Sequence, residues 1–389
     1  MFKNYLGKLA SAIAFALILS AATIFAQSTV TGGINGKITD QAGAFVPNAT
    51  VKVTNLGTNA TVTVTATSDG AYSVTQLNPG TYRVEITSGN FAPAKAEPVI
   101  VEVGRATPVD VKLSVGTAEA VVEVTAEAPV INTSDNSSTS NFNQTAINDL
   151  PINGRRWSNF AILSPNAVPD GTFGLISFRG ISGLLNNNTI DGGDNNQAFF
   201  SEERGRTRIN YVISQSSIRE FQVNTSNYSA EYGRSAGGVT NAVTKSGTNQ
   251  FHGELFYYNR NNRNGARNPL QFGSVLVGGV STRVPVKPVD LREQFGGAIG
   301  GPIVKDKLFF FFSYDQQRRN FPGLSVFQNP GYLNTANRTL LLGLGLTNPQ
   351  IDSTLNFLNS LTGETPRKGN QKIFFPKIDW HVNSNNTFS

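Results

Sequence analysis

Apolar and polar positions alternate in segments through most of the chain, and the length of these segments differs between its parts. Before residue 115, short alternating segments occur at 49–54, 61–65 and 82–87, separated by turn signals such as Asp69-Gly70 and Asn78-Pro79-Gly80. Strands that recur about every ten residues are typical of a β-sandwich. We therefore predict a compact β-sandwich over residues 28–115.

Longer segments follow after residue 250. Strands are predicted over 251–258, 295–304, 308–314 and 372–382, a fifth begins at Thr387, and a short helix is predicted near 350–361. The connections between these strands are long, short, long and short in turn, which is the asymmetry of a transmembrane β-barrel. The cluster Leu308–Phe312 needs an apolar neighbour on at least one face, and lipid supplies one. A fully buried strand in a soluble protein is the alternative.

Composition and charge agree with β-structure and exclude several functions. Of 389 residues, 39% are hydrophobic, 15% are charged and 26 are Phe, an aromatic excess that needs a large buried or lipid-facing surface. The net charge of +6 is dispersed and forms no long basic stripe, so we expect no nucleic-acid partner. The absence of cysteine excludes a disulfide framework and a thiolate metal site.

Residues 1–26 have the pattern of an export signal. Lys3 and Lys8 precede an apolar run from 9 to 25, and Ala26 offers a small residue at a cleavage site. An uncleaved membrane anchor is the alternative. Because no later segment is apolar for so long, any further membrane insertion is expected to use barrel strands.

The sandwich segment carries an ordered series of turn and core residues. The series is Gly36-x-Ile38-x-Asp40-x-x-Gly43, Val46-Pro47-x-Ala49-x-Val51, Ser68-Asp69-Gly70-x-Tyr72 and Leu77-x-Pro79-Gly80-x-Tyr82. It resembles the carboxypeptidase regulatory-like domain, a transthyretin-like sandwich without catalytic residues. Gly70 and Gly80 are then expected in turns, with Tyr72 and Tyr82 in the core. Related domains sometimes bind carbohydrate, so a scaffold role and a sugar-binding role both stay open.

A second series covers residues 128–248. It runs through Leu150-Pro-Ile-Asn-Gly-Arg-Arg156, Phe178-Arg179-Gly180, Asp191-Gly192, Ile218-Arg-Glu-Phe-Gln-Val223, Glu231-Tyr-Gly-Arg234 and Gly237-Gly238-Val239-x-Asn241-x-Val243-Thr244-Lys245-Ser246-Gly247. In this order the elements resemble the plug domain of TonB-dependent outer-membrane receptors of the Oar-like type. We expect Arg179 to pair with carboxylates in a polar lumen, Asp191 and Gly192 to form a tight turn, and Gly237 and Gly238 to allow close backbone approach.

The linker at 116–127 contains a short run of β-branched residues between the two domains. Its members are Val121, Val122, Glu123, Val124, Thr125 and Ala126. The run resembles the TonB box, the peptide that such receptors present to the energy-transducing protein TonB, and strand addition through main-chain hydrogen bonds would explain its loose sequence. The alternative is an ordinary last strand of the sandwich.

The resemblance implies a fold that is mainly β: an N-terminal β-sandwich, an α/β plug domain, and an incomplete antiparallel transmembrane β-barrel over 249–389. Plugged barrels of this kind have roughly 22 strands of about 9–11 residues. The residues from Gln250 to Ser389 are too few for that number. We therefore expect the N-terminal fragment of a longer receptor or a truncated gene product.

Enzyme chemistry finds little support in the sequence. His252 and His381 are the only histidines, no phosphate-binding loop occurs, and we expect no catalytic residue, no cofactor and no metal. The acidic and amide residues in 191–196 leave calcium open, although the EF-hand spacing is absent.

We predict TonB-dependent uptake of a ligand, such as an oligosaccharide or a peptide, across the outer membrane of a Gram-negative bacterium. TonB, outer-membrane lipid and the transported ligand are the expected partners. A surface carbohydrate-binding or adhesion protein without transport is the alternative.

Overall fold

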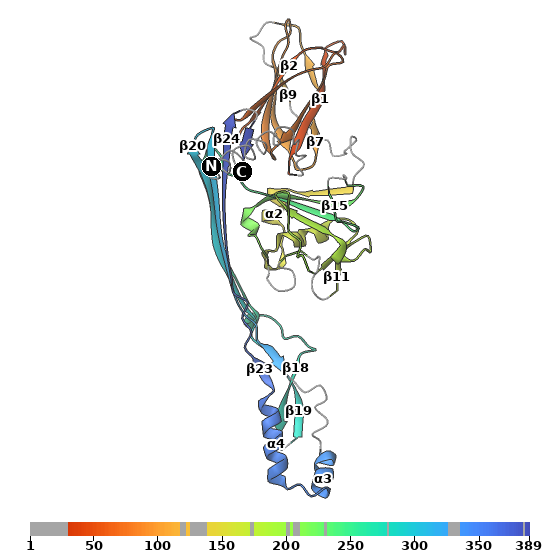
Figure 1. Cartoon of the computed structure of the whole chain (residues 1–389), viewed down its shortest axis with the longest axis vertical. Helices are drawn as coiled ribbons and strands as arrows, with labels where there is room; N and C mark the ends of the chain where they lie inside the picture. Colours follow the sequence, from red (N-terminus) through yellow and green to blue (C-terminus); the bar gives the residue numbers. More distant parts are fainter. Residues whose placement is uncertain are drawn as a thin grey trace, which may run out of the picture.

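The computed structural model describes residues 30–116, 122–124, 138–171, 175–199, 203–204, 211–228, 232–277, 280–325, 335–383 and 386–389. These residues form three bodies along one long axis (Figure 1). We call them the sandwich (strands up to β9), the plug (described residues of 138–248) and the wall (the long sheet that begins at β17). The predicted export signal, Val121, Thr125 and Ala126 lie outside the described residues.

The sandwich consists of two sheets that enclose an apolar core. The first pairs β1 (Gly32–Asp40) with β4 (Ala71–Leu77), β7 (Ala106–Pro108) and β8 (Val111–Leu113). The second has the order β3 (Thr61–Thr65), β2 (Thr50–Asn55), β5 (Gly80–Thr87), β6 (Ala94–Val101) and β9 (Val122–Val124). Alternate residues point inward, such as Val51 and Val53 on β2 and Val84 and Ile86 on β5, and each is at most 1% exposed. The period of two seen in the sequence thus defines the core face.

Two tyrosines and two glycines of the sandwich series have identifiable roles. Tyr72 and Tyr82 are buried, and their hydroxyls donate to the carbonyl oxygens of Val109 and Asn78, at 2.7 Å in both cases. Gly70 adopts a φ of +69°, as a turn glycine should. Gly80 does not have a positive φ; it starts β5, where an added Cβ would lie 3.2 Å from Asn55 Nδ2. The expectation of a special turn conformation was therefore wrong at Gly80.

The plug is built around a mixed sheet of five strands. Their order is β10 (Ser138–Phe142), β15 (Ile218–Ser226), β16 (Val239–Thr244), β13 (Asn187–Ile190) and β14 (Gly193–Asp194). Helix α2 (Gln144–Asp149), the 3-10 turn Trp157–Leu163 and the hairpin β11 (Ala167–Asp170)–β12 (Leu175–Phe178) cover it. Phe142 stacks on Phe221 with ring centroids 4.7 Å apart, and Trp157 and Phe160 complete an aromatic core.

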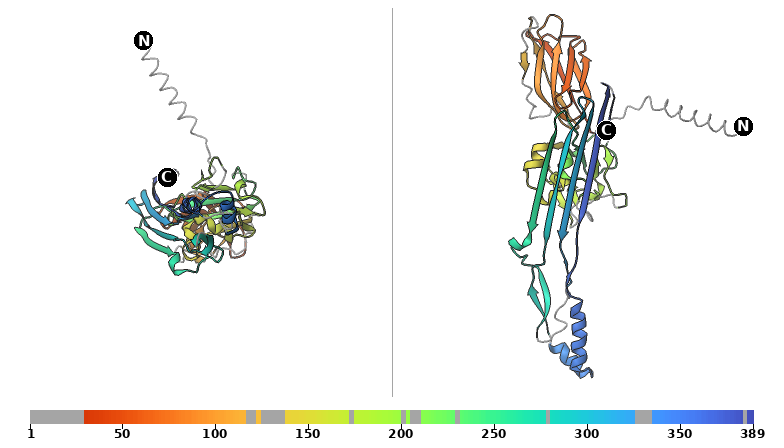
Figure 2. Two further views of the ribbon diagram at one scale, coloured as in Figure 1. Left: turned by 90° about the horizontal axis from the view of Figure 1, so that it is seen from below. Right: turned by 90° about the vertical axis from the view of Figure 1, so that its left-hand side faces the viewer.

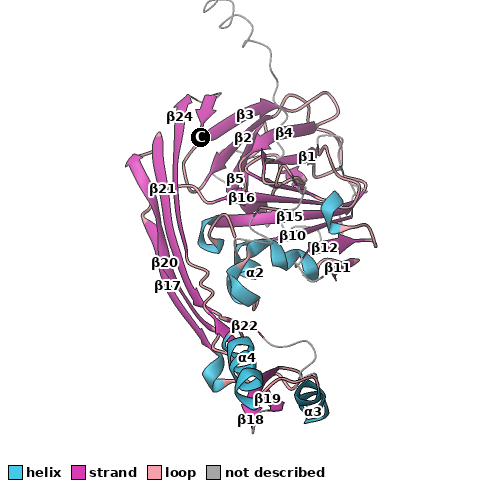
Figure 3. Cartoon of the chain, turned by 60° about the horizontal axis from the view of Figure 1, so that its bottom comes forward, coloured by secondary structure: helices cyan, strands magenta, loops and turns pink. Residues whose placement is uncertain are grey.

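The wall is an antiparallel sheet of long strands that curves around one side of the plug (Figures 2 and 3). Its order is β17 (His252–Asn261), β20 (Leu291–Val304), β21 (Leu308–Asn320), β24 (Gln371–Asn383) and β25 (Asn386–Phe388). All five predicted strands fall within these elements. Among the described residues, the sheet is open.

The connections at the two ends of the wall differ. A three-residue turn, 305–307, joins β20 to β21 beside the sandwich. The far end carries the hairpin β18 (Phe272–Val277)–β19 (Val280–Pro285), the pair β22 (Gly323–Ser325)–β23 (Gly363–Thr365), and helices α3 (Thr335–Gly343) and α4 (Asn348–Ser360). Helix α4 matches the predicted short helix, whereas the hairpin and α3 lie where a plain polar loop was expected.

Strand β21 shows how the wall separates its faces. Phe309, Phe311, Ser313 and Asp315 are buried, whereas Phe312 between them is 39% exposed. On β24, Phe374, Ile378 and Trp380 are more than half exposed. The exposed face is thus apolar, as on a membrane barrel, whereas the buried face carries both aromatic rings (Phe309 and Phe311) and polar groups (Ser313 and Asp315). Within the described residues, no helix is long and apolar enough to cross a membrane.

Candidate functional site

Asp315 is the centre of the contact between plug and wall. It is fully buried on β21, and its two carboxylate oxygens accept hydrogen bonds from Tyr211 Oη and Ser214 Oγ of the plug, both at 2.7 Å. Gln294 Nε2, from the neighbouring strand β20, donates to Tyr211 Oη at 2.8 Å and to the carboxylate at 3.2 Å. Burial and the nearby carboxylate raise the pKa of the Tyr211 phenol, so its hydroxyl stays protonated and remains a donor. The buried carboxylate of Asp315 thereby receives hydrogen bonds from both the plug and the wall.

Further polar contacts join plug and wall toward the sandwich. Ser217 and Ser313 bring their hydroxyl oxygens to 2.5 Å. Lys377 Nζ donates to Thr244 Oγ1 at 3.0 Å and lies 3.7 Å from Asp191 Oδ2. These contacts make the interface polar at several positions, although Phe375 of the wall also packs against the apolar cluster of the plug.

A cation–aromatic contact adds to this interface on β17. The Arg155 guanidinium lies 4.2 Å from the ring centroid of Phe256 and 4.7 Å from that of Tyr258. Arg155 Nη2 also donates to Ser216 Oγ at 2.9 Å. This arginine belongs to the Leu150–Arg156 element of the plug series, so that element packs against the first strand of the wall.

The Arg179-Gly180 pair forms a turn. Both residues have positive φ, +56° and +78°, as the two central residues of a type I′ turn require. The Arg179 side chain is exposed, and its Nη2 donates to the carbonyl oxygen of Gly237 at 3.4 Å. In the described part of the chain this is a backbone contact and not the carboxylate pair expected from the sequence. The turn carries the side chain out of the protein interior, where a counter-charge would have been needed.

Gly237 and Gly238 allow β16 to approach its neighbours closely. A Cβ on Gly237 would overlap Asn186 Oδ1, and one on Gly238 would lie 2.5 Å from Phe178 Cδ2. Asn186 Oδ1 accepts from the Gly238 amide at 3.0 Å. Arg179, Gly180, Gly237 and Gly238 therefore belong to one locality of the plug.

Asp191 and Gly192 form a second type I′ turn, between β13 and β14, with φ of +48° and +76°. The Asp191 carboxylate accepts from the Thr244 amide at 2.8 Å and from the Thr244 hydroxyl at 2.5 Å. Together with Lys377 it fixes the end of β16 against the wall. These two motif residues thus lie at the plug–wall contact, away from Arg179.

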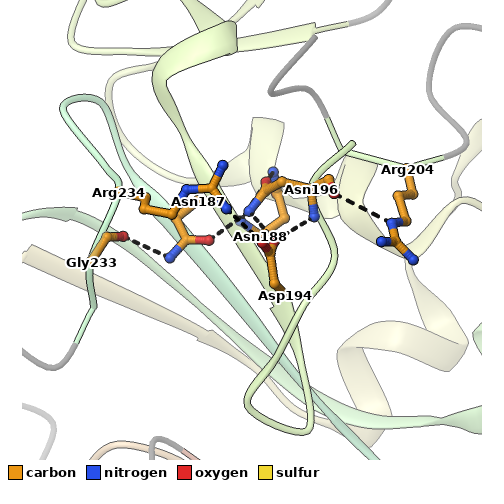
Figure 4. Close-up of polar contacts among 7 residues, drawn as sticks. All are labelled: Asn187, Asn188, Asp194, Asn196, Arg204, Gly233 and Arg234. Carbon is orange, nitrogen blue, oxygen red and sulfur yellow. Dashed lines mark hydrogen bonds and ion pairs between the residues drawn. The ribbon is translucent and has the colours of Figure 1, made fainter. Parts of the chain in front are cut away.

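A cluster of amides lies beside this turn (Figure 4). Asn196 Nδ2 donates to Asn187 Oδ1 and Asp194 Oδ1, both at 2.7 Å, and Asn188 Nδ2 donates to Asn196 Oδ1 at 3.1 Å. Arg234 Nη1 lies 2.7 Å from Asp194 Oδ2. Because these oxygens are already bonded within the cluster, they are not arranged as a calcium shell. Among the described residues, no group of three His, Asp or Glu side chains could hold a metal.

The two histidines lie on different strands of the wall. His252 is on β17 and His381 on β24, and β20 and β21 lie between these strands. They do not meet, so no shared site forms between them.

The sandwich docks onto the plug through the turn that follows β6. The Val103 amide donates to Glu220 Oε1 at 2.5 Å, and Gln222 Nε2 donates to the Val103 carbonyl oxygen at 3.1 Å. Asn141 Nδ2 donates to Glu102 Oε2 at 3.0 Å. Burial raises the pKa of the Glu220 carboxyl to about 7, although the Val103 amide and the Arg219 charge favour its ionised form.

The sandwich also contacts the short turn of the wall. Asn59 Nδ2 donates to Asp306 Oδ1 at 2.9 Å, and Asn249 Nδ2 donates to the same oxygen at 2.7 Å. The Asn249 amide donates to the Gly57 carbonyl oxygen at 2.8 Å. The sandwich is therefore attached to both other bodies at one end of the molecule.

The structure describes three residues of the TonB-box-like segment. Val122, Glu123 and Val124 form β9, which pairs in parallel with β6 in the register Ala94–Val122, Lys95–Glu123 and Ala96–Val124. For these three residues the pairing is that of the alternative given from the sequence, a last strand of the sandwich.

The sequence analysis did not find Asp315, Tyr211, Ser214, Gln294, Glu220 or Lys377. The alternation Ser313, Asp315, Gln317 after four phenylalanines was a usable signal, because polar residues on the buried face of a strand need partners. The identity of those partners could not be read, since about a hundred residues separate Asp315 from Tyr211 and Ser214.

Comparisons with known proteins agree with this arrangement. Residues 33–114 match the carboxypeptidase regulatory-like domain, and residues 243–337 match an outer membrane beta barrel domain. The chain is 29% identical over 309 residues to the TonB-dependent transporter Oar of Myxococcus xanthus, a match over 76% of this chain and 27% of that protein. It thus spans about a quarter of its relative's length.

Two solved structures are similar to part of the chain at low TM-score. The outer membrane transporter YddB of Escherichia coli has a TM-score of 0.42 at 14% identity, over 63% of this chain and 31% of that one. The siderophore receptor PirA of Acinetobacter baumannii has a TM-score of 0.31 at 18% identity, over 47% and 24%. The family matches and the Oar relative confirm the resemblance to Oar-like TonB-dependent receptors and the mainly β fold class.

The Asp315 network predicts the strength of the plug–wall contact. Asp315→Ala leaves the buried hydroxyls of Tyr211 and Ser214 without their acceptor, and we expect a loss of about 3–5 kcal/mol in the free energy of unfolding. The measurement is denaturant unfolding of the full chain in detergent, together with the rate of proteolysis within the plug. Asp149→Ala, an exposed change in α2 of the plug, is the matched control. Equal stability of the two variants would contradict the role given to Asp315.

The raised pKa of Glu220 predicts a pH dependence of sandwich docking. Because the folded pKa lies above the ordinary 4.5, the stability contributed is fully present below about pH 4.5 and is lost as the pH rises through about 7. From pH 5 to pH 8 this group should cost up to about 3 kcal/mol. Glu220→Gln, which cannot ionise, should lose that share of the pH dependence in unfolding titrations, whereas the exposed change Glu364→Gln should keep it. An unchanged pH profile in Glu220→Gln would show that the carboxyl does not titrate in this range.

Proposed function

We propose that this chain, which is similar to the Oar-like TonB-dependent transporters, forms the sandwich, plug and first barrel strands of a receptor for energised ligand uptake across the outer membrane of a Gram-negative bacterium. The observation that carries the proposal is the polar attachment of the plug to the inner face of a wall whose other face is apolar. A body held in this way can be released without separating an apolar core. The whole receptor's activity, ligand and partners are parts of the proposal.

The orientation follows from the connections of the wall. Membrane barrels have short turns on the periplasmic side and long loops outside. The three-residue turn 305–307 lies beside the sandwich, and the hairpin and helices lie at the opposite end. The sandwich, including β9, is then periplasmic. Helices α3 and α4 belong to the outer loops that first meet a ligand such as an oligosaccharide or a peptide.

In this proposal TonB acts on the periplasmic side. It pairs with the segment around Val122 by strand addition, and a pull on the linker shifts the plug relative to the wall. Many of the contacts that must break are hydrogen bonds and ion pairs, for which water is a replacement partner; the contact of Arg155 with Phe256 and the packing of Phe375 must break as well. Replacing each of these hydrogen bonds by one to water therefore costs less free energy than the strength of the bond in isolation suggests. No bond chemistry is involved, so the chain acts as a receptor and not as an enzyme.

The TonB contact can be tested at one residue. Val122→Pro removes an amide hydrogen and fixes φ, so binding of the TonB C-terminal domain to the full chain should fall at least tenfold. Val122→Ala keeps the amide and should bind within about threefold of wild type, because strand addition uses main-chain groups. The measurement is a binding titration in detergent, with unchanged thermal unfolding as the check on folding. Absence of binding by the wild-type chain would refute the assignment of this segment.

A second candidate function is carbohydrate binding by the sandwich. An open groove of about 790 Å³ is lined by both polar and apolar residues, namely Asn48, Thr50, Thr87, Ser88, Gly89, Asn90, Phe91, Pro93, Val115 and Gly116. Amide and hydroxyl groups beside an aromatic face suit a sugar ring.

A glycan panel tests this second function on the full chain. If the groove binds a sugar, Phe91→Ala should lower that binding at least tenfold, because the ring supplies the apolar contact. Phe45→Ala, on an exposed ring of the sandwich outside the groove, should leave it unchanged. The sandwich would be a scaffold if no glycan bound, or if both variants bound as the wild type does.

A further inference from the structure

Strand β9 lies at the end of a sheet. The order β3-β2-β5-β6-β9 places it outermost, and among the described residues β6 is its only strand partner. In a β-strand the backbone N–H and C=O groups of successive residues point to opposite edges, so pairing with β6 uses only one edge of β9. The other edge is a template for a further strand.

We propose that the sandwich is part of the TonB docking surface: β9 is held against β6 so that its free edge receives a strand of TonB. This rests on the proposed function of the segment. The bound state is then one continuous sheet in which β9 lies between β6 and the partner. Because β9 is already extended, the partner does not have to order it on binding, and that conformational cost is removed from the association.

The same arrangement connects the docking edge to the plug. Strand β6 ends at Val101, and two residues later Val103 exchanges two hydrogen bonds with Glu220 and Gln222 on β15. Gly104 packs so closely that a Cβ there would lie 2.6 Å from Gln222 Nε2. A load applied to β9 therefore reaches β15 through β6 and the sandwich, in addition to the covalent linker.

Cross-linking can test the proposal cleanly, because the chain contains no cysteine of its own. Lys95 and Glu123 are register partners on adjacent strands, which lie about 4.8 Å apart, so cysteines introduced at these two positions are expected on the same face of the sheet. The double variant Lys95→Cys/Glu123→Cys should form a disulfide under mild oxidation. The control pair Lys95→Cys/Val122→Cys places the second thiol on the opposite face and should not form one.

The readout is affinity for the TonB C-terminal domain, measured on the full chain in detergent before and after reduction. If β9 binds TonB while held on β6, the cross-linked chain should bind within about threefold of wild type or more tightly. A loss of more than tenfold that reduction restores would overturn the proposal, because the segment would then have to leave β6 to bind. Failure of the in-register pair to cross-link in a chain that binds TonB would also overturn it. If the wild-type chain does not bind at all, the proposed function fails first, and that result is distinct from these two.

Discussion

Asp315 has no exposed surface, and a charge in that position must be satisfied by neighbours. Its own strand cannot do so, and the donors come from the plug residues Tyr211 and Ser214 and from Gln294 on the next strand. Much else depends on this requirement. The wall needs a polar body against its inner face, and the plug needs a concave polar surface to cover its serines and amides. The sandwich, by contrast, has a complete apolar core of its own.

This difference between cores explains the architecture. The sandwich is stabilised by burial of Ile, Val and Leu from two sheets, and the plug has its own aromatic cluster around Phe221. Many contacts between bodies are made instead by side chains such as Asn59, Asn141 and Glu220, and by backbone groups such as those of Val103. Bodies with strong cores and polar interfaces move as units, because the interfaces exchange with water far more readily than the cores do.

Much of the fold could be predicted from the sequence, and the features that could not be predicted share a physical cause. Period-two alternation identified the strands of the sandwich and wall, since one face of each strand is buried, and the plug was recognisable from its ordered glycines and turn residues. A last sandwich strand at β9 was kept only as an alternative, and its partner β6 could not be identified, because the pairing depends on an edge almost thirty residues away. The partners of Asp315 and Glu220 were missed for the same reason. The sequence did not indicate that Arg179 lies on a type I′ turn, and among the described residues its side chain donates to a backbone oxygen.

Glu220 links docking of the sandwich on the plug to the binding of a proton. Burial raises the pKa of this carboxyl while Val103 covers it, so the docked form holds a proton more tightly than the separated form. Once water reaches the group, its affinity for the proton returns toward that of an ordinary carboxyl. Separation of the sandwich from the plug is therefore accompanied by release of protons. The equilibrium between docked and separated forms is therefore linked to the acidity of the compartment in which the sandwich lies.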